Sequence, residues 1–286
     1  MAIDRVFVAG AGLMGHGIAQ VHAAAGMAVT LYEPELARAE AGRERIAGNL
    51  DRAVAKSKLH GTERDAILGR CRATDDLAAA ADVDLVVEAV FEDVDVKTAL
   101  WAALDRVAPA DAIFGSNTSS IAIDRLAAAV GASRRARFVG VHFFSPVPVM
   151  PLIELIRSSA TDDATEAAIR ELAAALGKQV IVSADRPGFI VNRILIPFLG
   201  EAMRAYEQGI GTAEDIDTGA RIGLNHPMGP LALADFIGLD VVLGIMRVLH
   251  EGVGEPQFAP PAVLERLVAE GHLGQKSGRG FHAYPR

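Results

Sequence analysis

The stretch IDRVFVAGAGLMG, residues 3–15, decides the fold that the rest of the chain must complete. It begins with an apolar run typical of a buried strand, and an apolar-periodic helix is expected at residues 18–25. Between them, Gly10, Gly12 and Gly15 form the pattern GxGxxG. The first glycine permits a tight turn, the second lets the backbone approach a pyrophosphate, and the third lets helix and strand pack closely. The stretch therefore predicts a dinucleotide-binding βαβ unit.

An acidic residue follows the second predicted strand, residues 28–32. Glu33 stands where a carboxylate accepts hydrogen bonds from the adenosine ribose and repels a 2′-phosphate. The expected cofactor is therefore NAD rather than NADP. A glycine-rich turn without a ligand is the alternative interpretation.

Composition narrows the class of protein. The 286 residues are 51% hydrophobic, carry a formal net charge of −8 and contain one cysteine, Cys71. The acidic balance and the lack of a long basic run argue against a nucleic-acid partner. A single cysteine excludes an internal disulfide framework. With no visible signal sequence or apolar run long enough to span a membrane, a cytoplasmic location is expected.

Two further buried strands are expected to end at polar loops. After residues 84–90, Glu88, Glu92 and Lys97 become candidates for the cofactor side, because ligands bind at the carboxyl ends of parallel strands. Residues 113–115 are followed by SNTSS, residues 116–120, whose hydroxyls and amide could contact a ligand. The same serines could also cap the start of a helix at Ser119 or Ser120, with Asp124 in its first turn, and both interpretations can hold at once.

The stretch RFVGVHFFSPVPVMPLIELI, residues 137–156, places two polar groups in apolar surroundings. His142 ends one predicted strand, and Glu154 lies within a second. A buried carboxylate needs a partner, and a histidine held by a carboxylate is suited to general acid/base chemistry. The alternative is a structural core histidine with Glu154 on an exposed edge.

The two remaining regions are predicted to be helical. After Glu33 comes a charged region that includes Arg52, Lys56 and Lys58, which could meet an anionic ligand or form an ordinary solvated helix face. The second half of the chain, after a boundary placed at residues 185–186, is expected to consist of helices at residues 189–208 and 231–250, with Thr212 capping another. The apolar residues of the last helix predict a homodimer interface in this domain. No histidine has the spacing of a metal site.

Seven motifs together resemble the L-3-hydroxyacyl-CoA dehydrogenase family, and most closely its short bacterial 3-hydroxybutyryl-CoA dehydrogenases. They occur in order along the chain: GxGxMG, VVEAVFEDVDVK (86–97), SNTSS (116–120), HFFSPVPVMPLIE (142–154), PGFIVNRIL (187–195), NHPMGPLALADFIGLD (225–240) and GQKSGRGF (274–281). The expected fold is a Rossmann-type, doubly wound, mostly parallel sheet at residues 1–185, followed by an all-helical substrate and dimerisation domain at residues 186–286.

The resemblance implies NAD-dependent oxidation of a (S)-3-hydroxyacyl-CoA and assigns roles by position. His142 matches the catalytic base and Glu154 its orienting carboxylate, while Ser119 and Asn192 match polar groups of the substrate site. Lys56 aligns near residues that contact the CoA phosphates, and Arg52 is a further candidate for substrate binding. The expected cofactor-binding positions are Gly10, Gly12, Leu13, Met14, Gly15, Glu33, Ala89, Glu92, Lys97 and Asn117.

Three residues depart from the family pattern: Ser145 stands where Asn is usual, His282 where Tyr is usual, and Asp51 where a small polar residue is usual. They bear on acyl-chain preference and CoA affinity rather than on the base pair. Two alternatives remain: a dehydrogenase of a 3-hydroxy acid without CoA, and a non-catalytic NAD-binding protein.

Overall fold

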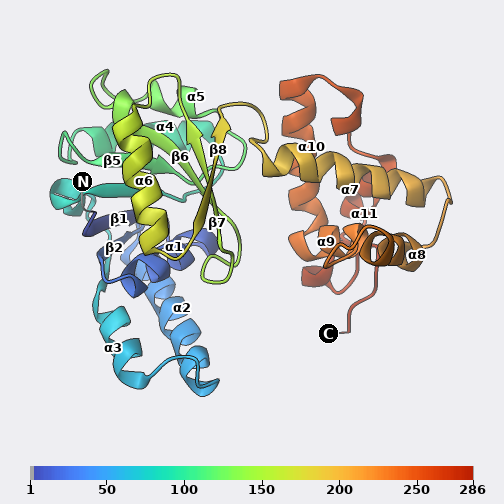
Figure 1. Cartoon of the computed structure of the whole chain (residues 1–286), viewed down its shortest axis with the longest axis horizontal. Coiled ribbons are helices and arrows are strands. Elements are labelled where there is room, and N and C mark those ends of the chain that lie inside the picture. Colours follow the sequence, from blue (N-terminus) through green and yellow to red (C-terminus); the bar gives the residue numbers. More distant parts are fainter. Residues whose placement is uncertain (1–2, 286) are drawn as a thin grey trace. The chain divides into compact units, whose positions relative to one another are not determined.

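A computed structural model describes residues 3–285 of the chain. The chain forms two compact units, Met1–Arg186 and Pro187–Arg286. Each unit has a hydrophobic core of its own. Figure 1 labels the elements of both.

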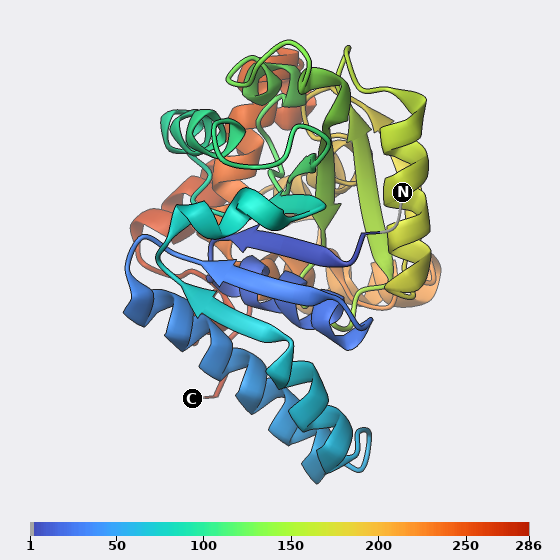
Figure 2. The ribbon, with the colours of Figure 1, turned by 90° about the vertical axis from the view of Figure 1, so that its left-hand side faces the viewer.

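The first unit is built on one eight-stranded sheet in the order β3-β2-β1-β4-β5-β6-β7-β8. Neighbouring strands are parallel except for β6 and β7, which are antiparallel. This arrangement confirms the predicted Rossmann-type sheet. Figure 2 shows the strands side by side. Their bounds are β1 Arg5–Ala9, β2 Ala28–Tyr32, β3 Cys71–Thr74, β4 Leu85–Glu88, β5 Ile113–Ser116, β6 Phe138–Phe143, β7 Leu152–Arg157 and β8 Gln179–Ala184.

Helices cover both faces of this sheet because successive side chains of a strand point to opposite faces. Val6 and Val8 of β1 belong to a core completed by four helices, while Phe7 points the other way. The four helices are α1 (Leu13–Ala24), α2 (Leu36–Ala55), α3 (Gly61–Gly69) and α6 (Asp163–Ala175). Helices α2 and α3 extend beyond the sheet as a hairpin (Figure 1).

An aromatic cluster fills the second face. The ring of Trp101, on α4 (Val94–Asp105), stacks on Phe114 at 4.9 Å and meets Phe138 edge-on at 4.8 Å between centroids. The short helix α5 (Ile123–Ala127) adds Leu126 to this face. Trp101 is the only tryptophan of the chain and is fully buried, so its fluorescence reports on the packing of this unit.

The carboxyl ends of the strands form the edge on which the predicted site residues converge. The chain runs outward from β1 to β3 and then returns to β4, so the order of strands reverses between β1 and β4. At such a switch point the loops after the two strands diverge and leave a crevice for a ligand. The glycine motif follows β1, and Ala89 follows β4.

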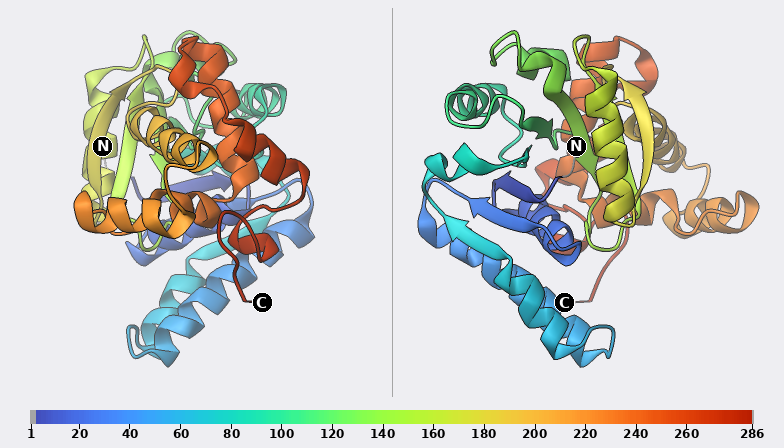
Figure 3. Two further views of the ribbon diagram at one scale, coloured as in Figure 1. Left: turned by 90° about the vertical axis from the view of Figure 1, so that its right-hand side faces the viewer. Right: turned by 60° about the vertical axis from the view of Figure 1, so that its left-hand side comes forward.

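The second unit is helical, as predicted (Figure 3, left). Its α-helices are α7 Val191–Glu207, α8 Ala213–Thr218, α9 Pro230–Ile237, α10 Leu239–Val253 and α11 Ala262–Ala269, and a π-helical turn lies at Gly219–Gly223. Thr212 caps α8 by accepting a hydrogen bond from the backbone N–H of Asp215, which confirms that prediction. Leu199 and Leu243 are buried in the shared core.

Two sequence-based helix predictions are wrong. The single helix expected at residues 231–250 is two helices, because Gly238 takes φ = 102°, a conformation that few other residues tolerate. The helix expected to begin at Ser119 or Ser120 begins at Ile123 instead. Its neighbouring serines have other hydrogen-bond partners, described below.

No helix within residues 3–285 is both long and apolar enough to cross a membrane.

His22 is a fully buried histidine inside α1. Its Nδ1 donates a hydrogen bond of 2.7 Å to the carbonyl oxygen of Ile18, and its ring meets Phe143 at 6.0 Å between centroids. Because the ring is fully buried, desolvation lowers the pKa of His22 to about 4 from an ordinary value of 6.5. The folded state therefore holds this ring neutral.

We expect His22 to make the first unit sensitive to acid. Its pKa is lower in the folded than in the unfolded state, so its contribution is complete above pH 6.5 and is lost as the pH falls toward about 4. The loss amounts to as much as about 3 kcal/mol. His22→Gln keeps a donor for Ile18 and should flatten this part of the pH dependence, measured by urea unfolding followed through Trp101 fluorescence. His250→Gln, at an exposed histidine, is the control; equal pH slopes for wild type and His22→Gln would contradict the assignment.

Candidate active site

The glycine loop has the geometry that a dinucleotide needs. Gly10 has φ = 102°, and a Cβ there would lie 2.5 Å from the carbonyl oxygen of Ala89. A Cβ on Gly15 would lie 1.7 Å from the carbonyl oxygen of Gly10, so the start of α1 is pressed against the turn. A Cβ on Gly12 would meet nothing within 4 Å. That open space, at the N-terminus of a helix, fits an approaching pyrophosphate.

Glu33 lies beside this loop. It follows β2, and its Oε1 accepts a hydrogen bond of 2.6 Å from the backbone N–H of Ala11. One carboxylate oxygen thus holds the glycine loop from the side. This contact places Glu33 where an acid can recognise a ribose next to the pyrophosphate position.

A buried ion pair lies at the end of β4. Lys97 of α4 is 1% exposed, and its Nζ contacts Glu88 Oε1 at 2.5 Å, Glu92 Oε2 at 3.2 Å and the carbonyl oxygen of Val90 at 3.4 Å. An ammonium group has three protons, and three oxygens surround it. Lys97 is therefore held between two carboxylates within the protein.

The two carboxylates differ in their surroundings. Burial raises the pKa of Glu88, and the nearby Lys97 ammonium and the Ser116 hydroxyl only partly offset it. Hydrogen bonds from the serine-rich loop and the charge of Lys97 hold the pKa of Glu92 below its usual value despite desolvation. Glu92 is therefore the firmly ionised member, and it faces the loop.

Glu92 fixes the SNTSS loop. Its Oε1 accepts hydrogen bonds from the Thr118 hydroxyl at 2.5 Å, the Ser119 N–H at 3.0 Å, and the Ser120 N–H and hydroxyl at 3.1 and 2.8 Å. Four donors on one oxygen explain why Ser119 and Ser120 do not cap a helix. On the other side, Asn117 Oδ1 accepts the backbone N–H of Phe143 at 2.8 Å. The loop is thereby joined to the residue that follows His142.

His142 and Glu154 are directly opposite each other in the antiparallel pair β6 and β7. Opposite residues place their side chains on one face of a sheet, so the register alone brings the two together. His142 Nδ1 lies 2.8 Å from Glu154 Oε2, and the two residues are 7% and 0% exposed. Because a carboxylate only accepts, Nδ1 carries the proton and Nε2 is the basic nitrogen of the neutral ring.

Sequence reasoning missed two parts of this arrangement. The ring of Phe144 lies 4.6 Å from the imidazole of His142, between centroids. Thr118, within the quoted SNTSS motif, gives Glu92 its shortest hydrogen bond. The run of polar residues at 116–120 is the only sequence signal for the contact of Thr118. Phe144 gives no signal, because it is one apolar residue among several in its stretch.

The predicted residues therefore divide into three groups. Most of those in the first unit converge on the carboxyl edge of the sheet: the glycine motif with Leu13 and Met14, Glu33, Ala89, Glu92, Lys97, Asn117, Ser119, His142 and Glu154. Arg52 and Lys56 lie at the end of α2, roughly 25–30 Å along the helix from its first residue. Asn192 lies on α7 of the second unit and is 7% exposed.

Comparison with known proteins identifies the family. Residues 5–186 match the model of the 3-hydroxyacyl-CoA dehydrogenase NAD-binding domain, and residues 188–284 match that of the C-terminal domain. The chain belongs to the 3-hydroxyacyl-CoA dehydrogenase family. The 3-hydroxybutyryl-CoA dehydrogenase of Mycobacterium tuberculosis is 50% identical over 99% of both chains.

Solved structures agree with this membership of the 3-hydroxyacyl-CoA dehydrogenases. M. tuberculosis FadB2 superposes with a TM-score of 0.97 at 49% identity, covering 100% of both chains. The (S)-3-hydroxybutyryl-CoA dehydrogenase PaaH1 of Ralstonia eutropha gives 0.95 at 41% identity, also over 100% of both chains.

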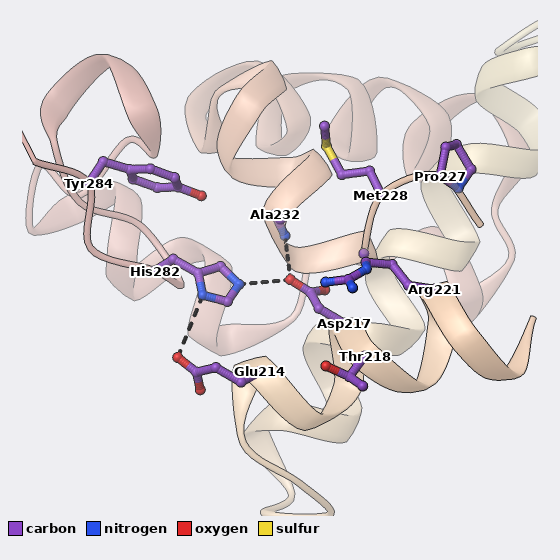
Figure 4. A pocket seen from close by; sticks show the side chains of 10 residues that line it. Glu214, Asp217, Thr218, Arg221, Pro227, Met228, Ala232, His282 and Tyr284 are labelled. Atoms are coloured by element: carbon purple, nitrogen blue, oxygen red, sulfur yellow. Dashed lines mark hydrogen bonds and ion pairs between the residues drawn. The ribbon is translucent and has the colours of Figure 1, made fainter. Parts of the chain in front are cut away.

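Two departures from the usual 3-hydroxyacyl-CoA dehydrogenase pattern have local partners. The carboxylate of Asp51 pairs with Arg64 of α3 at 2.9 Å, so its negative charge is partly neutralised within the α2–α3 hairpin. His282 Nε2 lies 2.7 Å from Asp217 Oδ2, and Nδ1 lies 3.8 Å from Glu214 Oε1 (Figure 4). Ser145 is exposed in the loop between β6 and β7.

His282 lines a cavity of about 540 Å³ in the helical unit, with Met228 and Arg221 on its other sides (Figure 4). Asp217 also accepts the backbone N–H groups of Leu231 and Ala232 at 2.8 and 2.9 Å, at the start of α9. His282 therefore attaches the last segment of the chain to a carboxylate that already caps a helix. Within residues 3–285 no group of three or more His, Cys, Asp or Glu side chains is arranged to hold a metal ion.

We expect the stability of the first unit to depend on the Glu88–Lys97 ion pair more than on either charge taken separately. Lys97→Met leaves Glu88 as a buried charge without its cation, which should lower the free energy of unfolding by about 3–5 kcal/mol. The double variant Glu88→Gln/Lys97→Met removes both charges. Its free energy of unfolding should fall less than that of Lys97→Met alone. Urea unfolding followed through Trp101 fluorescence measures all three proteins.

Arg64→Met provides the matched control, because it breaks an ion pair of the same unit that lies at the surface. Its effect should be much smaller. A double variant that loses as much stability as Lys97→Met alone, or more, would contradict this coupling.

Proposed function

We propose that this chain is an NAD-dependent (S)-3-hydroxyacyl-CoA dehydrogenase that interconverts a short-chain substrate such as 3-hydroxybutyryl-CoA with its 3-oxoacyl-CoA. The observation that carries the proposal is the His142–Glu154 pair, held at 2.8 Å on the same sheet edge as the dinucleotide loop. Family membership and the names of the relatives support the substrate class.

In the oxidative direction, His142 Nε2 takes the proton of the 3-hydroxyl group as general base. Glu154 accepts the hydrogen bond from Nδ1, which fixes the tautomer and favours the imidazolium as it forms. NAD, when bound, supplies the nicotinamide that accepts the hydride from C3. In the reverse direction the protonated His142 returns the proton to the oxygen.

Polar groups are proposed to hold the oxygen of the substrate. Ser119 lies in the loop that Glu92 and Asn117 hold beside β6, so its position is fixed relative to His142. Asn192 is proposed as a second polar group on the evidence of its place in the PGFIVNRIL motif. Such groups stabilise charge that develops on the oxygen.

The direct test is NADH oxidation with acetoacetyl-CoA, run beside NADPH and beside free acetoacetate. Rapid turnover with NADH and the thioester alone supports the reaction, the preference set by Glu33 and the need for CoA. Equal turnover of free acetoacetate would favour a dehydrogenase of 3-hydroxy acids without CoA. NADH binding without any turnover would favour the non-catalytic alternative.

Variants of the base pair should lose rate while keeping the cofactor. We expect His142→Gln to lower kcat by ~10²–10⁴-fold, the usual contribution of a general base. NADH affinity, measured by fluorescence titration, should change little. Glu154→Gln should lower kcat more than it raises KM, because the amide cannot stabilise the imidazolium. Loss of NADH affinity equal to the loss of rate would make His142 structural.

The α2 cations are proposed to contact the CoA phosphates. Arg52 is hydrogen-bonded to Asn49, and Lys56 follows at the C-cap of α2. Replacing both by Gln should raise KM for acetoacetyl-CoA about 3- to 30-fold, with kcat nearly unchanged, and should weaken the dependence of KM on salt. Arg106→Gln, an exposed arginine at the end of α4, is the control. An unchanged KM in the double variant would leave these residues as a solvated helix face.

We further propose a homodimer through the helical unit. Several of its large apolar side chains are exposed: Ile210, Ile222, Leu224, Phe236, Val241 and Val248. Exposed apolar residues in such number are typical of a surface covered by a partner. Gel filtration with light scattering should give twice the mass of the chain at micromolar concentration, and Phe236→Glu should shift the equilibrium toward the monomer. A wild-type monomer at that concentration would contradict this proposal.

We also propose that the protein is located in the cytoplasm. It rests on the single cysteine, which suits a reducing compartment.

A further inference from the structure

Lys178 is a buried cation that the mechanism above does not use. It stands between α6 and β8 and is 9% exposed. Its Nζ donates hydrogen bonds to the carbonyl oxygens of Val147 at 2.8 Å and Met150 at 2.7 Å. Within residues 3–285 it forms no ion pair with a carboxylate. Desolvation accordingly lowers the pKa of Lys178.

A charge in this position is costly. Burying an ammonium without a carboxylate is unfavourable, and the two carbonyl dipoles offset only part of the lost hydration. An apolar side chain would avoid that cost but could not donate to either carbonyl. We therefore attribute the presence of a lysine at this position to its hydrogen bonds with the two carbonyls rather than to packing in the core.

Lys178 binds the loop at residues 144–151, which joins the two strands that carry His142 and Glu154. Beyond the strands, the loop has few other hydrogen bonds: Pro146 O accepts the N–H groups of Val149 and Met150, and Pro151 O accepts that of Gln179. The two carbonyls bound by Lys178 lie in the middle and near the end of the loop. Lys178 thus supplies the side-chain bonds that tie it to the body of the unit.

The middle of the loop, at Val147, also packs against α1. Val147 is 2% exposed, and a Cβ on Gly17 would lie 3.0 Å from the Cβ of Val147. Val147 therefore packs closely against the helix that begins at the glycine motif. Its carbonyl is one of the two that Lys178 binds, so one residue of the loop is fixed from both sides.

The first residue of the loop is Phe144, whose ring lies 4.6 Å from the imidazole of His142, between centroids. Glu154 holds one ring nitrogen of His142. The contact with Phe144 further limits rotation of the imidazole about its Cβ–Cγ bond. The position of Phe144 depends in turn on the loop that follows it.

We propose that Lys178 is a positioning residue for the reaction: it fixes the loop at residues 144–151 and thereby keeps Phe144 against the imidazole of His142. This inference rests on the proposed function of His142 as general base. Lys178 acts through the loop rather than directly on His142.

The test uses the full-length enzyme with Lys178→Met, which keeps the length of the side chain and removes its charge and donors. We expect kcat with acetoacetyl-CoA to fall about 10- to 100-fold, because small misplacements of a catalytic group cost that much. The dissociation constant of NADH should stay within about twofold. Lys178→Arg keeps the charge and donors and should recover at least part of kcat. Should Lys178→Met fail to fold, Lys178→Gln, a neutral donor, takes its place in the same comparison.

Arg134→Met is the matched control, because Arg134 is also buried and donates to backbone carbonyls, those of Ala108 and Ala112, at the opposite edge of the sheet. It should lower stability without lowering kcat per folded molecule. A Lys178→Met enzyme with normal kcat per folded molecule would overturn the proposal, as would an equal loss of kcat in Arg134→Met.

Hydrogen–deuterium exchange separates this inference from the proposed function. Peptides covering residues 144–151 should exchange faster in Lys178→Met than in wild type, whether or not the enzyme turns over acetoacetyl-CoA. Unchanged exchange would overturn the role of Lys178 in the loop. An inactive wild type with the expected change in exchange would instead contradict the proposed function of His142.

Discussion

The cross-strand contact between His142 and Glu154 is the interaction on which the rest of this active-site edge depends. It exists because β7 runs antiparallel to β6 in a sheet that is otherwise parallel, with His142 opposite Glu154. A shift of the register by one residue would turn one of the two side chains to the other face. The Gly140–Ile156 pair beside it stabilises this register, because a Cβ on Gly140 would lie 2.8 Å from the Cβ of Ile156.

Around that pair, charged side chains fix the loops of the active-site edge. Lys97 joins Glu88 to Glu92, and Glu92 gathers the donors of the SNTSS loop onto one oxygen. Asn117 then links this loop to the backbone beside His142. Such fully satisfied polar networks are rigid, because each member would lose a buried partner if it moved. The rigidity sets the relative positions of Ser119 and the base before any ligand arrives.

The sequence predicts the architecture well because its strongest signals are local. The glycine motif is a strand-to-helix junction of fixed form, and the pairing of His142 with Glu154 follows from the cost of burying a carboxylate. The break at Gly238 could not be predicted, because the apolar pattern continues across it while the backbone takes a positive φ. The network of Lys97 was likewise hidden, since the three oxygens around it come together only through the chain's turn after β4. The short strand β3 and the loop contacts of Phe144 also depend on packing between distant segments.

The central claim is that Glu154 fixes the tautomer of His142 and so makes Nε2 the base. Nitrogen-15 NMR of the histidine side chains, under mildly alkaline conditions that favour neutral rings, measures this directly. Glu154→Gln serves to assign the resonance of His142. We expect a neutral ring protonated at Nδ1, with a hydrogen-bonded proton shifted strongly downfield, and an unprotonated Nε2. A neutral ring protonated at Nε2 would contradict it, because that nitrogen could then take no proton from a substrate hydroxyl.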